Sequence, residues 1–243
     1  MKYFNPLNYV RYFQRLLTGH FKKTKTRKIY SESFIDKALE KVSTQEELID
    51  FHFRTYSEIN HVNKEMFTKL LNNLDKKKLN ILETGSSAHG TNSSMLFINY
   101  VKKFGGSFIT VDINPDIKLK FNHLVKENIE FYTDDSVQYI MNIAPYKIKK
   151  LDVIYLDSFD LDIKNPQPSE QHGLDEFLLL NKYIKTGTLI AIDDTPKDFD
   201  LFGAGSNKLN HIPGKGSLVL EYIKKHGGYE ILYHYYSVIL KKL

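Results

Sequence analysis

The sequence predicts an α/β protein with a doubly wound, seven-stranded sheet that is mostly parallel. From residue 79 onward, short apolar strand segments alternate with helical patterns, and the chain ends in two β-rich segments that abut almost directly. Strands that alternate with helices form a parallel sheet covered on both faces, whereas two abutting strands form an antiparallel hairpin. Five parallel units closed by such a hairpin account for all seven strands.

The sequence before this pattern predicts an N-terminal helical and basic segment, residues 1–78, ahead of a main domain, residues 79–243. Asn5-Pro6 is a typical helix start, and the basic run KKTKTRK that follows the first helix reads as an exposed linker. Residues 31–78 carry apolar positions at helical spacing. We expect the first helix to pack on its own domain or on a dimer partner. A peripheral membrane contact and a clamp on an anionic substrate are the alternatives.

The main domain is expected to contain five strand-helix units and the terminal hairpin. The expected strands are 79–84, 107–113, 129–134, 151–158, 188–194, 229–236 and 237–243. The expected helices between them are 93–105, 116–127, 136–144, 173–187 and 216–228. Glycines at the ends of several helices are typical stop signals.

Charge and composition exclude several classes of protein. Residues 1–30 carry eight Lys and Arg and no acid, so the rest of the chain has 26 Lys and Arg against 29 Asp and Glu, a net charge of −3. The main domain is slightly acidic, and we expect no nucleic-acid partner. No apolar run is long enough for a transmembrane helix, and the N-terminus lacks a signal-peptide pattern. The absence of cysteine excludes disulfides and thiolate metal sites and fits a cytoplasmic protein.

The loop after the first expected strand, in ILETGSSAHG, is a candidate cofactor-binding turn. A strand, a glycine turn and a helix N-terminus together expose backbone N–H groups to a ligand. The spacing from Gly85 to Gly90 approaches the dinucleotide pattern G-x-G-x-x-G, but Ser87 stands at the second glycine position. Glu83 would repel a pyrophosphate and suits a ligand with an ammonium or hydroxyl groups. Gly85 is expected to let the backbone approach such a ligand.

With this loop and two later strand ends, the sequence resembles the class I S-adenosylmethionine-dependent methyltransferases. Their first motif is matched by ETGSSAHG, their second by Asp112 in ITVDIN, and their third by Asp134-Asp135-Ser136 in YTDDSVQY. The resemblance covers about residues 79–243 and implies a Rossmann-like fold with the antiparallel terminal hairpin. It departs from the family at Ser87 and Ala88, where many members have glycine. The implied cofactor-binding residues are Glu83, Gly85, Ser86, Ser87, Gly90, Asp112, Ile113, Asp135, Ser136 and Asp157.

Acidic residues end two further expected strands, with Asp157 after one and Asp193-Asp194 after the other. Carboxyl ends of parallel strands meet in one crevice, so these carboxylates would repel one another unless a cation neutralised them. Oxygen ligands suit Mg²⁺, Mn²⁺ or Ca²⁺. The pattern is similar to that of the metal-dependent O-methyltransferases acting on catechols, caffeoyl esters and macrolide sugars. That resemblance implies metal binding by all three aspartates; cofactor or backbone contacts and helix capping are the alternatives.

The catalytic base is less well indicated. Where the catechol enzymes carry a lysine base, this chain has Asp160, so that role does not transfer. His172, after a proline-rich loop, is the candidate base, together with Asp157 as a catalytic residue; a surface or capping histidine is the alternative. His89 is a weaker candidate. Lys215, between two glycines, either reaches an anionic substrate group or is a solvated loop lysine.

These observations favour an S-adenosylmethionine-dependent methyltransferase that uses Mg²⁺ or Mn²⁺ to methylate a hydroxyl of a small substrate such as a sugar or natural-product moiety. An NAD-dependent oxidoreductase is the first alternative, although this chain lacks the second glycine of the dinucleotide-binding pattern. A non-catalytic binding protein with the same fold is the second, because a fold alone does not define a function.

Overall fold

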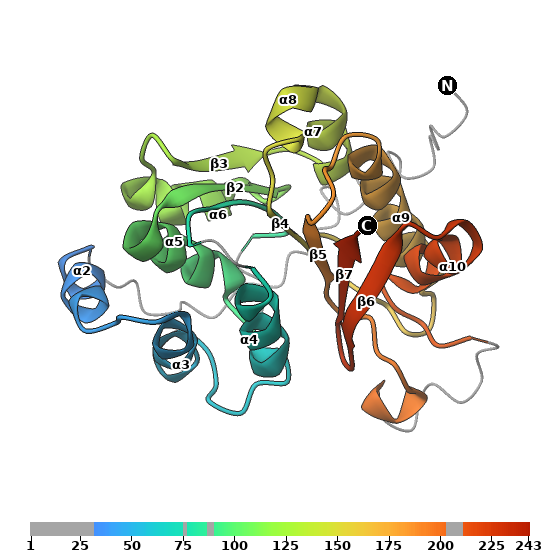
Figure 1. Cartoon of the computed structure of the whole chain (residues 1–243), viewed down its shortest axis with the longest axis horizontal. Coiled ribbons are helices and arrows are strands. Elements are labelled where there is room, and N and C mark those ends of the chain that lie inside the picture. The colour runs from blue at the N-terminus through green and yellow to red at the C-terminus, as the bar shows by residue number, and fades with distance from the viewer. Residues whose placement is uncertain (1–31, 75–76, 87–89, 203–210) are drawn as a thin grey trace.

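The computed structural model describes residues 32–74, 77–86, 90–202 and 211–243, and Figure 1 shows the whole chain. The first helix expected at Asn5-Pro6, the basic run after it, and the loop positions Ser87, Ala88 and His89 lie outside the described residues.

The centre of the molecule is a seven-stranded sheet in the order β3-β2-β1-β4-β5-β7-β6 (Figure 1). Its strands are β1 Leu79–Thr84, β2 Gly106–Asp112, β3 Ile129–Thr133, β4 Val153–Leu156, β5 Leu189–Ile192, β6 Tyr229–His234 and β7 Val238–Lys242. The first five strands run parallel, and β7 pairs antiparallel with both β5 and β6. The predicted fold class, including the terminal hairpin, is therefore confirmed.

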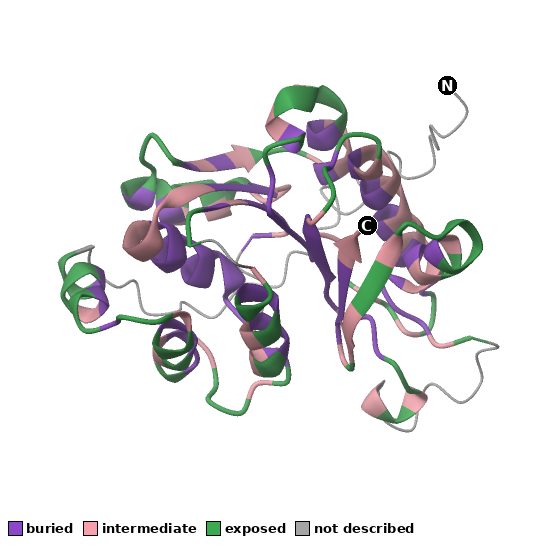
Figure 2. Ribbon diagram, in the orientation of Figure 1, coloured by how far each residue is buried: buried purple, intermediate pink, exposed green. Residues whose placement is uncertain are grey.

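Helices cover both faces of the sheet. They are α2 Glu32–Glu40, α3 Gln45–Thr55, α4 Lys64–Asn72, α5 Ser93–Phe104, α6 Pro115–Phe121, α7 Ser136–Asn142, α8 Pro145–Ile148, α9 Gln167–Asn181 and α10 Ser217–His226, with 3₁₀ turns η1 Asn122–Leu124 and η2 Phe199–Phe202. Neighbouring residues on one strand face opposite layers: Ile81 and Tyr155 join the core with α2 to α5, while Leu82 and Ile154 join the core with α7, α9 and α10. The central strands are buried on both sides, as Figure 2 shows.

The described N-terminal helices pack into the same core as the sheet. Phe67 of α4 lies with its ring centroid 5.2 Å from that of Tyr155 on β4 and 6.3 Å from that of Phe53 on α3. Helix α3 begins with a capping box in which Thr44 and Glu47 exchange side-chain and backbone hydrogen bonds. Residues 32–74 therefore bury their apolar stripes against the sheet. A separate N-terminal segment ending at residue 78 stays a prediction.

Helix α9 differs from its predicted form in a way that matters for the site. It begins at Gln167, six residues before the expected start, and a proline occupies its first turn. Proline is tolerated there because the first N–H groups of a helix have no partner within the helix. His172 consequently lies on α9 itself and not in a loop before it.

No helix among the described residues is both long and apolar enough to cross a membrane.

Candidate functional site

The candidate site lies at the carboxyl ends of the parallel strands, where the strand order reverses between β1 and β4. Ligands in open α/β sheets bind at this kind of switch point. The turn after β1 begins with Gly85, whose φ is +81° and whose N–H donates to the carbonyl of Val111 over 2.9 Å. A Cβ at this position would lie 2.2 Å from the backbone oxygen of Asp157. The backbone after β4 therefore approaches Gly85 closely, and the predicted approach of Gly85 to a ligand stays a prediction.

Glu83, near the end of β1, is completely buried beneath this turn. Its Oε2 accepts hydrogen bonds from Ser94 Oγ at 2.5 Å and from Thr110 Oγ1 at 2.7 Å. Burial raises the pKa of Glu83 to about 7, against the lowering effect of the surrounding hydroxyls. Its other oxygen, Oε1, has no hydrogen-bond partner among the described residues.

Asp112, the last residue of β2, is held by two backbone amides. Its Oδ2 accepts from the N–H of Ser86 at 2.8 Å, and its Oδ1 accepts from the N–H of Asn114 at 2.7 Å. Burial raises its pKa to about 6, although both amides favour the ionised form. The side chain is only partly exposed, as is Ile113 beside it. Asp112 is therefore a carboxylate of fixed orientation at the rim of the site.

The third predicted motif forms the start of α7. Asp135 is the N-cap of this helix, and its side chain accepts from the N–H of Gln138 at 3.0 Å. Ser136 is buried, with its Oγ 2.8 Å from His172 Nε2 on α9. The motif thus has a clear structural role in joining α7 to α9, which does not test its predicted contact with a cofactor.

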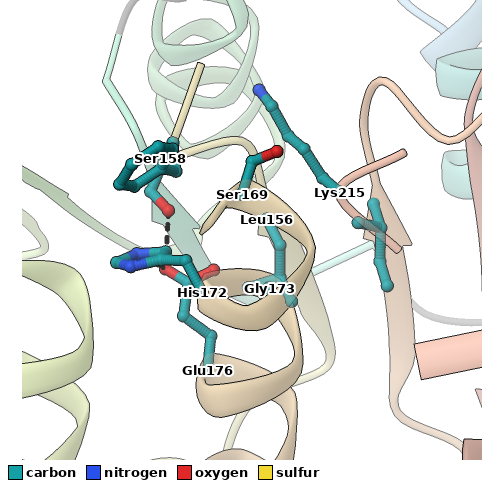
Figure 3. Close-up of a pocket in the computed structure, with 9 residues that line it drawn as sticks. Leu156, Ser158, Ser169, His172, Gly173, Glu176 and Lys215 are labelled. Atoms are coloured by element: carbon teal, nitrogen blue, oxygen red, sulfur yellow. Dashed lines mark hydrogen bonds and ion pairs between the residues drawn. The ribbon is translucent and has the colours of Figure 1, made fainter. Parts of the chain in front are cut away.

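His172 belongs to a buried polar group that lines a pocket at the carboxyl ends of β4 and β5 (Figure 3). Its Nε2 lies 3.5 Å from Glu176 Oε1, which also accepts from Ser158 Oγ at 2.9 Å. Burial disfavours the charged imidazole, but the Glu176 carboxylate more than offsets this, so the pKa of His172 is raised. The catalytic role of His172 stays a prediction.

The acidic residues after β4 and β5 surround a lysine. The ammonium of Lys215 donates to Asp157 Oδ1 and lies 3.0 Å from Asp194 Oδ2. The Lys215 side chain is only 6% exposed. Burial lowers the pKa of Lys215, but the charges of Asp157, Asp194 and Asp193 together raise it by more. The ammonium therefore stays charged. The interpretation of Lys215 as a solvated loop lysine is therefore wrong.

Asp193 has different partners from the other two aspartates. Its Oδ1 accepts from Asn63 Nδ2 at 2.8 Å and from the N–H of Asp194 at 2.9 Å, and its Oδ2 accepts from the hydroxyl of Tyr155 at 2.8 Å. Asp194 in turn accepts from the hydroxyl of Tyr236 at 2.7 Å. These hydrogen bonds fix the orientation of both carboxylates.

The predicted metal set of Asp157, Asp193 and Asp194 does not fit a divalent cation in this arrangement. Within the described part of the chain, no cluster of three or more His, Cys, Asp or Glu side chains is arranged to hold a metal ion. The physical reason is local: Lys215 already bridges Asp157 and Asp194, and both oxygens of Asp193 are engaged by other donors. In the described structure the cation beside Asp157 and Asp194 is the ammonium of Lys215.

Sequence reasoning did not find Asn63, Tyr155 and Tyr236 as partners of the acidic pair after β5. They come from the start of α4, from within β4 and from the β6–β7 turn. None of them stands in a motif, because each reaches the site only through the packing of distant segments.

No known protein-family model and no curated protein matches the sequence. Solved structures do match: MycE, a methyltransferase from the mycinamycin biosynthetic pathway in complex with Mg and SAH, aligns with a TM-score of 0.57 and 15% identity, over 82% of this chain and 55% of MycE. The chain has the class I methyltransferase fold. MycE in complex with Mg, SAH and mycinamycin VI aligns with a TM-score of 0.58 and 13% identity, over 92% of this chain and 68% of MycE.

Cofactor-bound Rv0187 from MTB aligns over nearly the full length of both chains, 98% of this one and 97% of that one, with a TM-score of 0.50 and 11% identity. The match to MycE in its complex with Mg and SAH spans only a little over half of the MycE chain. At these identities the shared property is the methyltransferase fold, and its mostly parallel seven-stranded sheet with an antiparallel C-terminal hairpin agrees with the sequence prediction.

Proposed function

We propose that this protein is an S-adenosylmethionine-dependent methyltransferase. The observation that carries the proposal is Asp112, whose carboxylate is fixed by two backbone amides at the end of β2, beside the switch point of a methyltransferase fold. An oriented carboxylate at that place is suited to accept hydrogen bonds from the two ribose hydroxyls of the cofactor.

The remaining cofactor contacts are proposed from the same edge of the sheet. Glu83 has an unpartnered buried oxygen suited to an ammonium or hydroxyl donor, and Ser136 and Asp157 lie at neighbouring strand ends. Gly85, Ser86, Ile113 and Asp135 complete the described part of the set, with Gly90 at the far end of the loop. S-adenosylmethionine would supply an electrophilic methyl group, and these residues would bind and orient it.

For the acceptor we propose a small hydroxylated molecule, such as a sugar or natural-product moiety, methylated on oxygen. MycE, which shares the fold, has been seen with a natural product of its own pathway. His172 is the proposed base, and Asp157 the proposed second catalytic residue. Assistance by Mg²⁺ or Mn²⁺ is supported by the Mg in the MycE complexes and opposed by the arrangement around Lys215.

Calorimetric titration with S-adenosylmethionine, its demethylated product and NAD tests the proposal. The first two should bind and NAD should not. Replacing Asp112 with alanine should weaken binding by about tenfold or more, because a charge-assisted hydrogen bond of about 1.5–3 kcal/mol is lost. Asp116→Ala, an exposed acid in the first turn of α6, is the matched control and should bind normally.

Binding of NAD in place of S-adenosylmethionine would favour the oxidoreductase alternative. Binding of S-adenosylmethionine without turnover against a broad set of hydroxylated acceptors would favour a non-catalytic binding protein. A dimer or membrane contact through residues 1–30, and a cytoplasmic location, stay predictions to be tested by light scattering, vesicle sedimentation and cell fractionation.

A further inference from the structure

The loop that carries Lys215 packs against the residues that follow β5 and against helix α9. The N–H of Lys215 donates to the carbonyl of Asp194 at 3.0 Å, and the N–H of Gly216 donates to Thr195 Oγ1 at 2.9 Å. A Cβ on Gly214 would lie 2.8 Å from the oxygen of Asp194. These contacts fix the backbone on both sides of Lys215, so its position is determined by packing.

Helix α9 closes over the same loop. A Cβ on Gly173 would lie 2.2 Å from the backbone oxygen of Lys215, so only glycine allows the helix to approach this closely. Figure 3 shows the Lys215 side chain directed away from His172 and Glu176, two of the polar residues that line the same pocket. The ammonium therefore pairs with the aspartates after β4 and β5 and not with His172 and Glu176.

Two features of the cluster leave hydrogen-bonding capacity that a ligand could use. An ammonium has three N–H donors, and Lys215 directs them at two carboxylates, Asp157 and Asp194. Asp157 Oδ2, in contrast, is buried and has no hydrogen-bond partner among the described residues. Buried polar atoms without a partner are rare and require an explanation such as a water or a ligand.

We propose that Lys215 is the resident cation of the acceptor site, in the position between Asp157 and Asp194 that a divalent metal would otherwise take. The wild-type site then binds no Mg²⁺ or Mn²⁺, and the positive charge offered to the acceptor oxygen comes from the ammonium. The part that concerns the acceptor rests on the proposed methyltransferase function. The part that concerns the metal stands on the geometry of the cluster alone.

The test uses Mn²⁺ as the probe, with its binding to the full-length protein followed by electron paramagnetic resonance. The wild type should show no specific Mn²⁺ site. Lys215→Met removes the ammonium but keeps much of the side-chain volume, so the freed carboxylates should gain one Mn²⁺ site, with affinity raised by about tenfold or more. The double variant Lys215→Met/Asp157→Asn should lose that site again.

Lys185→Met is the matched control. Lys185 also pairs with an aspartate beside β4, Asp152 at 2.8 Å, but at the opposite end of the strand. This variant should bind no Mn²⁺. Turnover of the wild type should be unaffected by EDTA. Lys215→Met should lose turnover, and added Mn²⁺ or Mg²⁺ should be needed to restore any of it.

Three results would overturn the inference. They are a wild-type Mn²⁺ site that Asp157→Asn removes, loss of wild-type turnover in EDTA that Mg²⁺ restores, and a Lys215→Met protein that folds yet gains no Mn²⁺ site. The wild-type measurements decide the question even if Lys215→Met does not fold. S-adenosylmethionine binding is measured separately on the wild type, so its failure would count against the proposed function and leave the metal result intact.

Discussion

At the scale of single residues, burial controls the two carboxylates that flank the proposed cofactor site. Glu83 and Asp112 both have raised pKa values, to about 7 and about 6, because each is taken out of water without a cationic partner. Each therefore changes its charge near neutral pH. The consequences differ, because Glu83 is enclosed by hydroxyls while Asp112 is partly exposed at the rim.

We expect Glu83 to make folding pH-dependent. Its pKa in the folded state is above its unfolded value of 4.5, so its contribution to stability is fully present below about pH 4.5 and is lost as the pH rises through 7. The shift corresponds to roughly 3 kcal/mol. The free energy of unfolding in urea should fall between pH 5 and pH 8 in the wild type. In Glu83→Gln it should fall less, by about the contribution of Glu83. If stability depends on pH equally in the two proteins, Glu83 is not the source of the pH dependence.

Asp112 should instead make cofactor binding pH-dependent. Its ionised form is the better acceptor for ribose hydroxyls, and with a pKa of about 6 it becomes protonated as the pH falls from 7 to 5. Affinity for the demethylated cofactor should fall over that range with a midpoint near 6. Asp112→Asn should bind weakly with much less pH dependence. A wild-type affinity that is constant from pH 5 to pH 7 would contradict this.

At the scale of elements, the approach of helix α9 to the Lys215 loop is the critical contact. Because a Cβ on Gly173 would lie 2.2 Å from a backbone oxygen, Gly173→Ala must displace either the helix or the loop. Alanine gains about 1 kcal/mol in helix propensity, but overpacking of this kind costs about 1–3 kcal/mol and should dominate.

Gly173→Ala should therefore lower both the thermal midpoint and the turnover. Gln171→Ala, on the same helix, removes a local hydrogen bond to Asp175 and should leave both the thermal midpoint and the turnover close to the wild type. If Gly173→Ala is more stable than the wild type and equally active, the close packing of α9 on Lys215 does not constrain the site.

At the scale of the whole molecule, Asn63 connects segments that are far apart in the chain. From the start of α4 its amide donates to Asp193 after β5 and to Thr91 before α5, while its Oδ1 accepts from Ser237 in the terminal hairpin. The described N-terminal helices thus reach the carboxyl edge of the sheet directly.

We expect Asn63→Ala to destabilise the protein by about 2–3 kcal/mol, because a buried carboxylate loses a donor. Turnover should fall as well, since Asp193 would no longer be held. Asn72→Ala, at an exposed position with one 3.4 Å bond to Glu46, should change stability by less than about 0.5 kcal/mol. Chemical denaturation of both variants provides the comparison, and an Asn63→Ala protein as stable as Asn72→Ala would exclude this link.

The periodic part of the fold was predictable because it depends on local patterns. The strand at 79–84 was predicted with its observed bounds, and the hairpin and the order of motifs at successive strand ends also follow from alternation and turn residues. The early start of α9 was missed because a proline pair was taken as a loop signal, although proline also fits the first turn of a helix.

From the sequence alone, one can determine the fold class and the convergence of Glu83, Asp112, Asp157 and Asp193-Asp194 on one edge of the sheet, since parallel strands place their carboxyl ends together. Only the tertiary structure decided what neutralises the acids after β4 and β5. Lys215 follows Asp194 by 21 positions, and its burial depends on Gly173 and on a loop held against β5. No local pattern encodes a contact made by packing between distant segments, so a metal was the natural expectation and a lysine is what the fold supplies.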